Sequence, residues 1–203
     1  GTLLGYTSML WAAPKLSFED GDYLTVFGSM GVGGLLGGSL PGLIYGEKEE
    51  FSNTVGGVLL GTALGYGTGL VISQFSERST GDAAEALLMT SLGGLFGQGL
   101  AAFTADTPAQ TRTRRALTMG GAGLGITAGY LFADKTAYES EDYWLISYLA
   151  AYGGFNGAWF PGLWLEDTGN LKFSNQSVGG AMVGTALGAT AGMVLSQYEK
   201  FTF

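Results

Sequence analysis

The chain has 203 residues, a formal net charge of −8, and neither cysteine nor histidine. Without these two residue types there are no disulfides, no thiol nucleophiles, no common zinc ligand set and no histidine acid–base catalysis. The acidic balance also argues against nucleic acid or anionic lipid as a partner, because both need a basic surface. We therefore expect a non-enzymatic protein with no catalytic residues, no cofactor and no metal site.

Glycine accounts for 37 of the residues and recurs in blocks along the chain. One kind of block, Gly33-Gly34 with Gly37, returns twice at steps of 60 residues. A second kind, which begins with Gly57 and Gly61, has glycines spaced by four and also occurs three times. The alternation of the two blocks predicts a tandem repeat in which every unit has a first and a second segment.

The repeat also predicts how the chain is divided. Gly1 to Tyr6 resembles Gly61 to Tyr66, so we assign residues 1–14 to the second half of a preceding, truncated repeat. Three repeats follow, at residues 15–76, 77–135 and 136–203. We interpret them as one membrane-embedded domain that belongs to a functional unit larger than this chain.

In chain order, six stretches contain no Asp, Glu, Lys or Arg: residues 23–46, 51–76, 86–105, 116–133, 143–165 and 173–198. Each is close to the roughly 20 mostly apolar residues with which a helix crosses a bilayer core. We therefore expect an all-α fold of tandem helical hairpins, with about six membrane-spanning helices.

The ends of these stretches carry helix-terminal signals. Acidic clusters such as Asp82 with Glu85 precede the first segment of each repeat, where negative charge complements the helix dipole and predicts an N-terminus. Ser52 and Asn53 open a second segment and are expected to serve as N-caps. Pro41 and its counterpart in the third repeat lie far along a first segment, where a helix kinks or ends.

The glycines themselves predict how the helices pack. Glycine inside a water-exposed helix costs roughly 1 kcal/mol relative to alanine, so their number must be offset by close helix contact. In lipid, small residues spaced by four open a groove that lets two backbones approach. The expected helix-packing residues are Gly33, Gly37, Gly57, Gly61, Gly65, Gly69, Gly93, Gly97, Gly121, Gly125, Gly129, Gly153, Gly157, Gly180, Gly184, Gly188 and Gly192.

Through Gly57, Gly61, Gly65, Gly69 and their copies, the chain resembles the glycine-zipper transmembrane helical-hairpin repeats of uncharacterised bacterial envelope proteins. The resemblance covers nearly the whole chain. It implies close helix packing and carries no activity with it.

Two other folds are compatible with parts of the pattern. Val58, Leu60, Thr62 and Leu64 alternate with small residues, as in a strand of a transmembrane β-barrel. Such barrels use strands of roughly ten residues with turns between them, and the six stretches lack turn residues at their middles. A soluble helical array is the other alternative, although its helices normally keep a charged outer face.

We expect a structural or anchoring role within a larger envelope protein or complex. The expected partners are the lipid bilayer and further copies or a larger membrane complex, with no nucleic acid. The alternative is a channel or conduit for ions or small solutes, whose candidate pathway residues are Gln98 and Asn156, the most polar residues of the apolar stretches. The expected location is a membrane, in the bacterial cell envelope, with inner and outer membrane both open.

Overall fold

The structure is a computed structural model that describes residues 20–48, 50–75, 79–104, 111–133, 135–163 and 175–198. Within these ranges the chain forms α-helices and short 3-10 helices and contains no strand. The all-α expectation is therefore confirmed, and the β alternative does not hold for this part of the chain. Residues 1–14, assigned to a preceding repeat, lie outside the described residues.

The helices closely follow the stretches that lack charge. They are α2 (Asp20–Tyr45), α3 (Phe51–Phe75), α4 (Thr80–Thr104), α5 (Thr111–Phe132), α6 (Ser140–Trp159) and α7 (Asn175–Tyr198), with the 3-10 helices η2 (Gly46–Lys48) and η4 (Phe160–Leu163). Four of them, α2, α4, α5 and α6, begin before their uncharged stretch, α4 and α5 by the most. α4 takes in the acidic residues that precede its apolar stretch, and α5 takes in three arginines.

Capping boxes begin α4 and α6. The Ser79 hydroxyl accepts from the Asp82 N–H at 3.2 Å, and the Asp82 carboxylate accepts from the Ser79 N–H at 3.1 Å. Glu139 and Asp142 form the equivalent box before α6. Each box satisfies N–H groups that have no partner within the helix, so the acidic clusters do mark helix starts.

The expected N-caps of α3 are wrong. Ser52 and Asn53 lie inside the first turn, and the carbonyl of Glu50 accepts from the N–H groups of Asn53 and Thr54 at 3.0 and 3.3 Å. The helix starts earlier than the Ser-Asn pair indicates, because the glutamate is the residue whose carbonyl accepts the first helical hydrogen bond.

Proline marks the far ends of α2 and α6. Pro41 lies in the last part of α2, which ends at Tyr45, and Gly46 follows with a φ of +61°. This left-handed conformation is one that glycine adopts without strain, and it ends the helix. Pro161 is the second residue of η4, which begins directly after α6.

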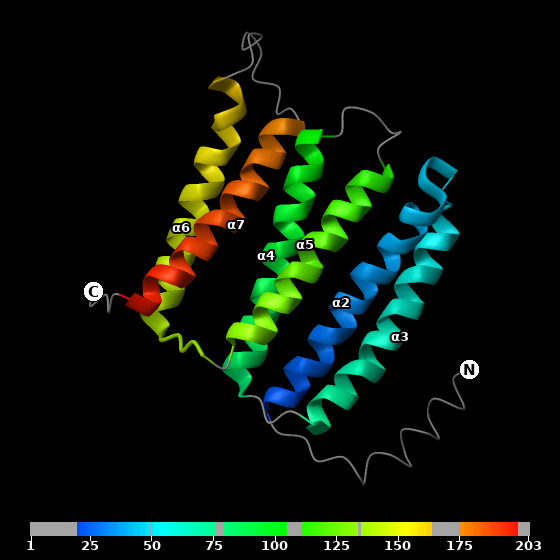
Figure 1. Ribbon diagram of the computed structural model, residues 1–203, viewed down its shortest axis with the longest axis horizontal. Coiled ribbons are helices and arrows are strands. Elements are labelled where there is room, and N and C mark those ends of the chain that lie inside the picture. The colour runs from blue at the N-terminus through cyan, green and yellow to red at the C-terminus, as the bar shows by residue number, and fades with distance from the viewer. Residues whose placement is uncertain are drawn as a thin grey trace.

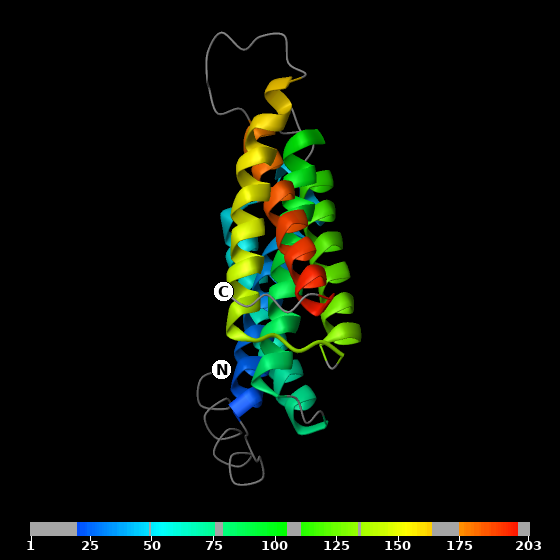
Figure 2. The same cartoon turned by 90° about the vertical axis from the view of Figure 1, so that its left-hand side faces the viewer.

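Successive helices pack in pairs, α2 with α3, α4 with α5 and α6 with α7, and Figure 1 shows the three pairs side by side. α4 lies at the centre, in contact with α2, α5 and α7. α3 and α6 form opposite edges, and each packs mainly on one helix, its own pair partner. Seen from the side, the helices run along one common long axis (Figure 2).

Small residues fill the interior, while large apolar side chains lie outside. The buried residues of α3 are Gly61, Gly65, Gly69 and Ser73. Leu59, Leu60 and Leu64 of the same helix are 63% or more exposed. A hydrophobic cluster of the ordinary kind occurs between α4, α6 and α7, and its buried members are Leu92, Ile146, Ala189 and Met193.

Candidate functional site

The contact between α2 and α3 is made by backbone against backbone. A methyl group added at Gly33 would overlap the carbonyl oxygen of Gly61, and one added at Gly61 would overlap the carbonyl oxygen of Gly33. Gly37 and Gly57 meet in the same reciprocal way one turn further along. No larger residue fits at these positions unless the two helices move apart.

The same contact recurs between α4 and α5. Gly93 and Gly121 each lie against the carbonyl oxygen of the other, as Gly33 and Gly61 do. One turn away, Gly97 lies against the carbonyl oxygen of Leu117, which occupies the place that Gly57 has in the first pair. At this contact, glycine on one of the two helices is therefore sufficient for the backbones to approach closely.

The third pair, α6 and α7, repeats this geometry. Gly153 and Gly184 make the reciprocal contact, and Gly157 and Gly180 make the next one. Gly184 thus corresponds in space to Gly121, at a step of 63 residues rather than 60. The extra residues fall between the two helices of the pair, so the contact keeps its register while the connection lengthens.

Every glycine named as a packing residue faces backbone of the paired helix. The remaining ones lie further along the second helices: Gly65 against Ser29, Gly69 against Val26, Gly125 against Met89, Gly129 against Ala86, Gly188 against Leu149 and Gly192 against Ile146. By contrast, an added methyl would meet open space at Gly31, Gly56, Gly67, Gly120 and Gly123. These five outward-facing glycines all lie outside the four-residue series.

Two glycines outside the expected packing set join neighbouring pairs. Gly99 of α4 and Gly179 of α7 lie so close that a methyl on either would come within 2.8 Å of the carbonyl oxygen of the other. Neither glycine belongs to the series spaced by four. Gly179 is adjacent to Gly180 of that series, and Gly99 lies two residues after Gly97. This contact joins the second pair to the third.

A buried carboxylate lies at the start of α4. Glu85 is 4% exposed, and its Oε2 lies 2.5 Å from the hydroxyl of Thr136, which also lies 3.0 Å from the Phe132 carbonyl oxygen. The Tyr138 hydroxyl donates to Oε1 of Glu85 at 3.4 Å. Sequence reasoning treated Glu85 only as a helix-terminal acid, because partners some 50 residues away give no local signal.

Tyr138 is perturbed by this environment. Burial, followed by the adjacent charge of Glu85, raises the pKa of Tyr138 to about 12 from 10.0, because both disfavour the phenolate. The segment between α5 and α6, which contains Tyr138, is also bonded to α7. Gln197 of α7 donates to the Ala137 carbonyl at 3.2 Å and accepts from the Ala137 N–H at 3.4 Å. The cluster is therefore a junction between the second and third pairs.

The candidate pathway residues are not brought together. Gln98 is exposed on α4, and Asn156 is exposed on α6. The Asn156 amide donates one hydrogen bond to the Tyr152 carbonyl of its own helix at 2.7 Å. Among the described residues, no group of three or more acidic side chains could hold a metal ion.

Apolar grooves separate the pairs. One, of about 740 Å³, runs between α4, α5 and α7, where Phe96 and Ala186 are among its lining residues. Glu85, Thr136 and Tyr138 of the junction also line it.

Four of the helices are long and apolar enough to cross a membrane, over Gly21–Tyr45, Phe51–Phe75, Thr80–Phe103 and Asn175–Tyr198. The corresponding helices are α2, α3, α4 and α7. No protein-family model, no curated protein and no solved structure matches this chain.

Proposed function

We propose that this chain is a non-enzymatic, membrane-embedded structural domain that anchors or scaffolds a larger envelope protein or complex, and that it assembles by close helix packing. In this proposal the three helix pairs are tandem repeats, and all six helices span the membrane. The bilayer is the first partner, and the bacterial cell envelope is the proposed location.

The observation that carries the proposal is the inverted burial of large and small residues. In water, exposed Leu35, Leu59 and Leu124, at 67 to 75%, would cost free energy that buried glycines do not return. In lipid there is no such cost, and helices associate by packing small residues against each other's backbone. A lipid environment therefore accounts for both the exposed leucines and the buried glycines, whereas water does not.

Hydroxyl side chains on the helices fit the same solvent. Ser39, Thr90 and Thr190 donate to the carbonyl four residues earlier in their own helix, at 2.7 to 2.8 Å. An unpaired hydroxyl in hydrocarbon costs several kcal/mol, and these bonds within the helix remove that cost. These three hydroxyls therefore enter the membrane interior in paired form.

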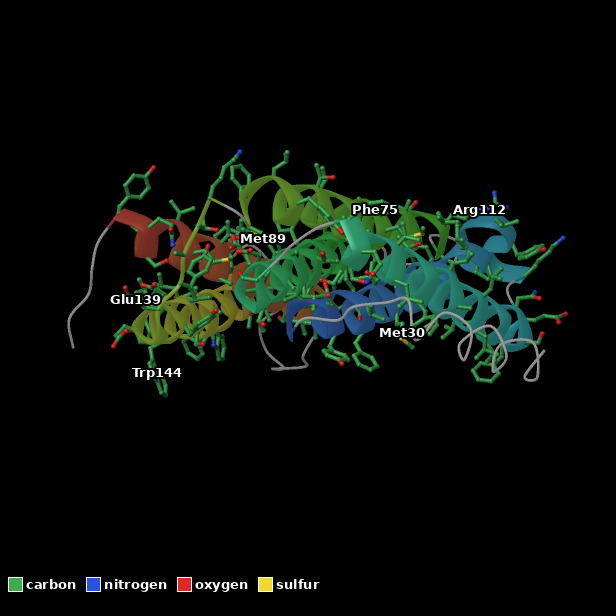
Figure 3. All side chains as sticks on the ribbon, turned by 90° about the horizontal axis from the view of Figure 1, so that it is seen from below. Met30, Phe75, Met89, Arg112, Glu139 and Trp144 are labelled. Carbon is green, nitrogen blue, oxygen red and sulfur yellow. The ribbon has the colours of Figure 1, made fainter. Side chains whose placement is uncertain are left out.

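α5 and α6 are less apolar than the other four, and specific features support their spanning. The three arginines of α5 all lie in its first turns, from which long side chains reach the membrane surface. α6 has exposed Tyr143 and Trp144 at its start and exposed Trp159 at its end. Trp144 points outward from the bundle in Figure 3. Aromatic residues at both ends of a helix are typical of membrane interfaces.

Cell fractionation tests the proposal directly. The chain is expressed in bacteria, and the membrane fraction is washed with alkaline carbonate and then extracted with mild detergent. We expect the protein to stay in the membrane until detergent is added and to give a helical circular dichroism spectrum in detergent. A protein that is recovered in buffer without detergent, folded and monodisperse, would overturn the proposal.

A conductance measurement tests the alternative role as a conduit. We expect the purified protein to show no conductance in planar bilayers, whereas a conductance that changes in Asn156→Asp would favour the conduit.

A further inference from the structure

The groove between the second and third pairs has a floor and two walls. α4 contacts both α5 and α7, whereas α5 and α7 do not approach each other in the described part of the chain. α4 therefore forms the floor, with Met89 and Phe96 among its lining residues, and α5 and α7 form the walls. We call this the α4 groove. Its volume of about 740 Å³ is in the range of sites that bind small ligands, and it is open between the two walls.

The length of the α4 groove matches one leaflet of a bilayer. Its lining residues lie within 85–96 of α4, 121–132 of α5 and 186–198 of α7. At a rise of 1.5 Å per residue, each of these stretches is about 16 to 18 Å long. The hydrocarbon core of a bilayer is roughly 30 Å thick, so one leaflet contributes roughly 15 Å. A single acyl chain that enters from the membrane surface therefore fits along the whole groove.

The two ends of the α4 groove differ in polarity. The deep end is lined by Phe96, Gly121 and Ala186, which offer no polar side chain. The opposite end, which we call the mouth, lies where α4 begins and α5 and α7 end, and its polar lining residues are Glu85, Lys135, Thr136, Tyr138, Gln197 and Tyr198. Of the described residues that line the stretch between, Thr190 alone is polar, and its hydroxyl bonds to a carbonyl of its own helix. The groove is therefore amphipathic along its length.

Glu85 gives the mouth a buried negative charge. Its carboxylate is 4% exposed and accepts from the hydroxyls of Thr136 and Tyr138, which are neutral donors. Within the described residues, no Lys or Arg forms an ion pair with it. A buried charge is costly unless an opposite charge and further hydrogen bonds compensate it. The mouth therefore favours a ligand that brings both a positive charge and N–H donors.

We propose that the α4 groove binds a phospholipid with an ethanolamine headgroup. One acyl chain lies along α4, and the ammonium group donates to the carboxylate of Glu85, which has acceptor capacity beyond its two hydroxyl partners. Lys135, exposed at the same mouth, pairs with the lipid phosphate. The headgroup has no net charge, in keeping with the acidic balance of the chain. The inference rests on the proposed membrane function and names the lipid class that the domain selects.

Competition between headgroups tests the selection. A choline headgroup has the same phosphate and the same charge but no N–H donor, and a glycerol headgroup has no cation. Ethanolamine, choline and glycerol phospholipids with identical acyl chains are added in equal amounts to the natural chain, purified in mild detergent and stripped of lipid. Native mass spectrometry counts the retained lipids of each class. We expect one ethanolamine lipid per chain, in about tenfold excess over the choline lipid, which corresponds to one hydrogen bond to a charged group.

Two variants that each remove one carboxylate charge locate the headgroup. Glu85→Gln keeps the size of the side chain and an acceptor for the hydroxyls, so it should abolish the preference for ethanolamine over choline. Glu141→Gln removes the same charge from an exposed position in the first turn of α6, outside the groove, and should leave the preference unchanged. Thr190→Phe places a large side chain in the groove and should reduce the retention of all three lipids.

A photoactivatable ethanolamine lipid keeps the test decisive if a variant fails to fold. With the reactive group at the end of its acyl chain, it should label the natural chain near Phe96 and Ala186, and only weakly near exposed Leu60 of α3.

Three outcomes would overturn the proposal: retention that is equal or favours another headgroup, a preference that survives Glu85→Gln, and labelling spread evenly over the outer surfaces. If the chain needs detergent for extraction but selects no headgroup, the lipid site fails while the membrane proposal stands.

Discussion

Gly33 of α2 and Gly61 of α3 each lie where a side chain of the other would have to pass, because a methyl on either glycine overlaps the carbonyl oxygen of its partner. Gly93 with Gly121 and Gly153 with Gly184 have the same relationship. Backbone atoms do not move aside as the end of a flexible side chain does, so the fold depends on the absence of a single carbon atom at each of these positions.

Adjacent glycines of α5 isolate this effect. Gly121→Ala should destabilise the α4–α5 contact by about 1–3 kcal/mol, the usual cost of forced overpacking. Gly120→Ala places the same methyl in open space and should be neutral or slightly stabilising, because alanine favours the helix. Thermal unfolding in one detergent compares the two variants with the natural chain. Equal melting temperatures for Gly120→Ala and Gly121→Ala would show that close approach of the helices does not hold the pair together.

The Glu85 junction should depend on its hydroxyl partner. Thr136→Val keeps the shape of the side chain but removes the donor to the buried carboxylate, so we expect a loss of about 1–3 kcal/mol. Thr127→Val is the matched control, because the Thr127 hydroxyl is exposed and bonds only to the carbonyl of Gly123 in its own helix. Denaturant titration in detergent gives both values. A Thr136→Val loss no larger than that of Thr127→Val would remove Glu85 from the account of how the second and third pairs are joined.

Tyr138 gives the junction a pH dependence on the alkaline side. Its pKa is raised from 10.0 to about 12 in the folded protein, so the folded state holds the phenolic proton more tightly than the unfolded state. The stabilising contribution is therefore complete below about pH 10 and is lost as the pH rises toward 12. The difference in phenolate absorbance between the natural chain and Tyr138→Phe should show one tyrosine that titrates near pH 12. A difference curve with its midpoint at pH 10 would contradict the partly buried placement of this side chain beside Glu85.

Arg112 links the first and second pairs by its bond to the Ile44 carbonyl, next to the left-handed Gly46. Arg112→Ala should lower stability by about 1 kcal/mol, the net value of one hydrogen bond at an exposed position. Thr113→Ala changes the next exposed residue of the same helix and serves as the comparison. Unfolding midpoints in detergent measure both, and indistinguishable midpoints would mean that this bond does not contribute to the junction.

The positions of the helices and their pairwise contacts followed from local features of the sequence. Residues without charge mark the apolar stretches, and the four-residue glycine spacing places Gly61, Gly65 and Gly69 on one side of α3, where the structure buries them. Both signals are periodic and short in range, so a single sequence displays them.

Features that depend on residues distant in sequence were not predictable. The contact of Gly99 with Gly179 and the partners of Glu85 arise when separate pairs come together. The first turn of α5 was also missed. The expected segments were defined by the absence of charge, whereas arginine has a high helix propensity and extends the helix toward its N-terminus. By length and composition alone, four helices rather than six are apolar enough to span a membrane.

The depth of Leu64 in the bilayer tests the central claim most directly. Leu64 lies in the middle of α3 and is 63% exposed, whereas Lys48 is exposed in η2, just before that helix. A spin label is attached to Leu64→Cys, Leu124→Cys or Lys48→Cys in phospholipid vesicles, and its collisions with oxygen and with a water-soluble nickel chelate are measured. The account predicts that labels at Leu64 and Leu124 meet oxygen and exclude nickel, while the label at Lys48 meets nickel. Nickel access at Leu64 equal to that at Lys48 would contradict a membrane-embedded bundle.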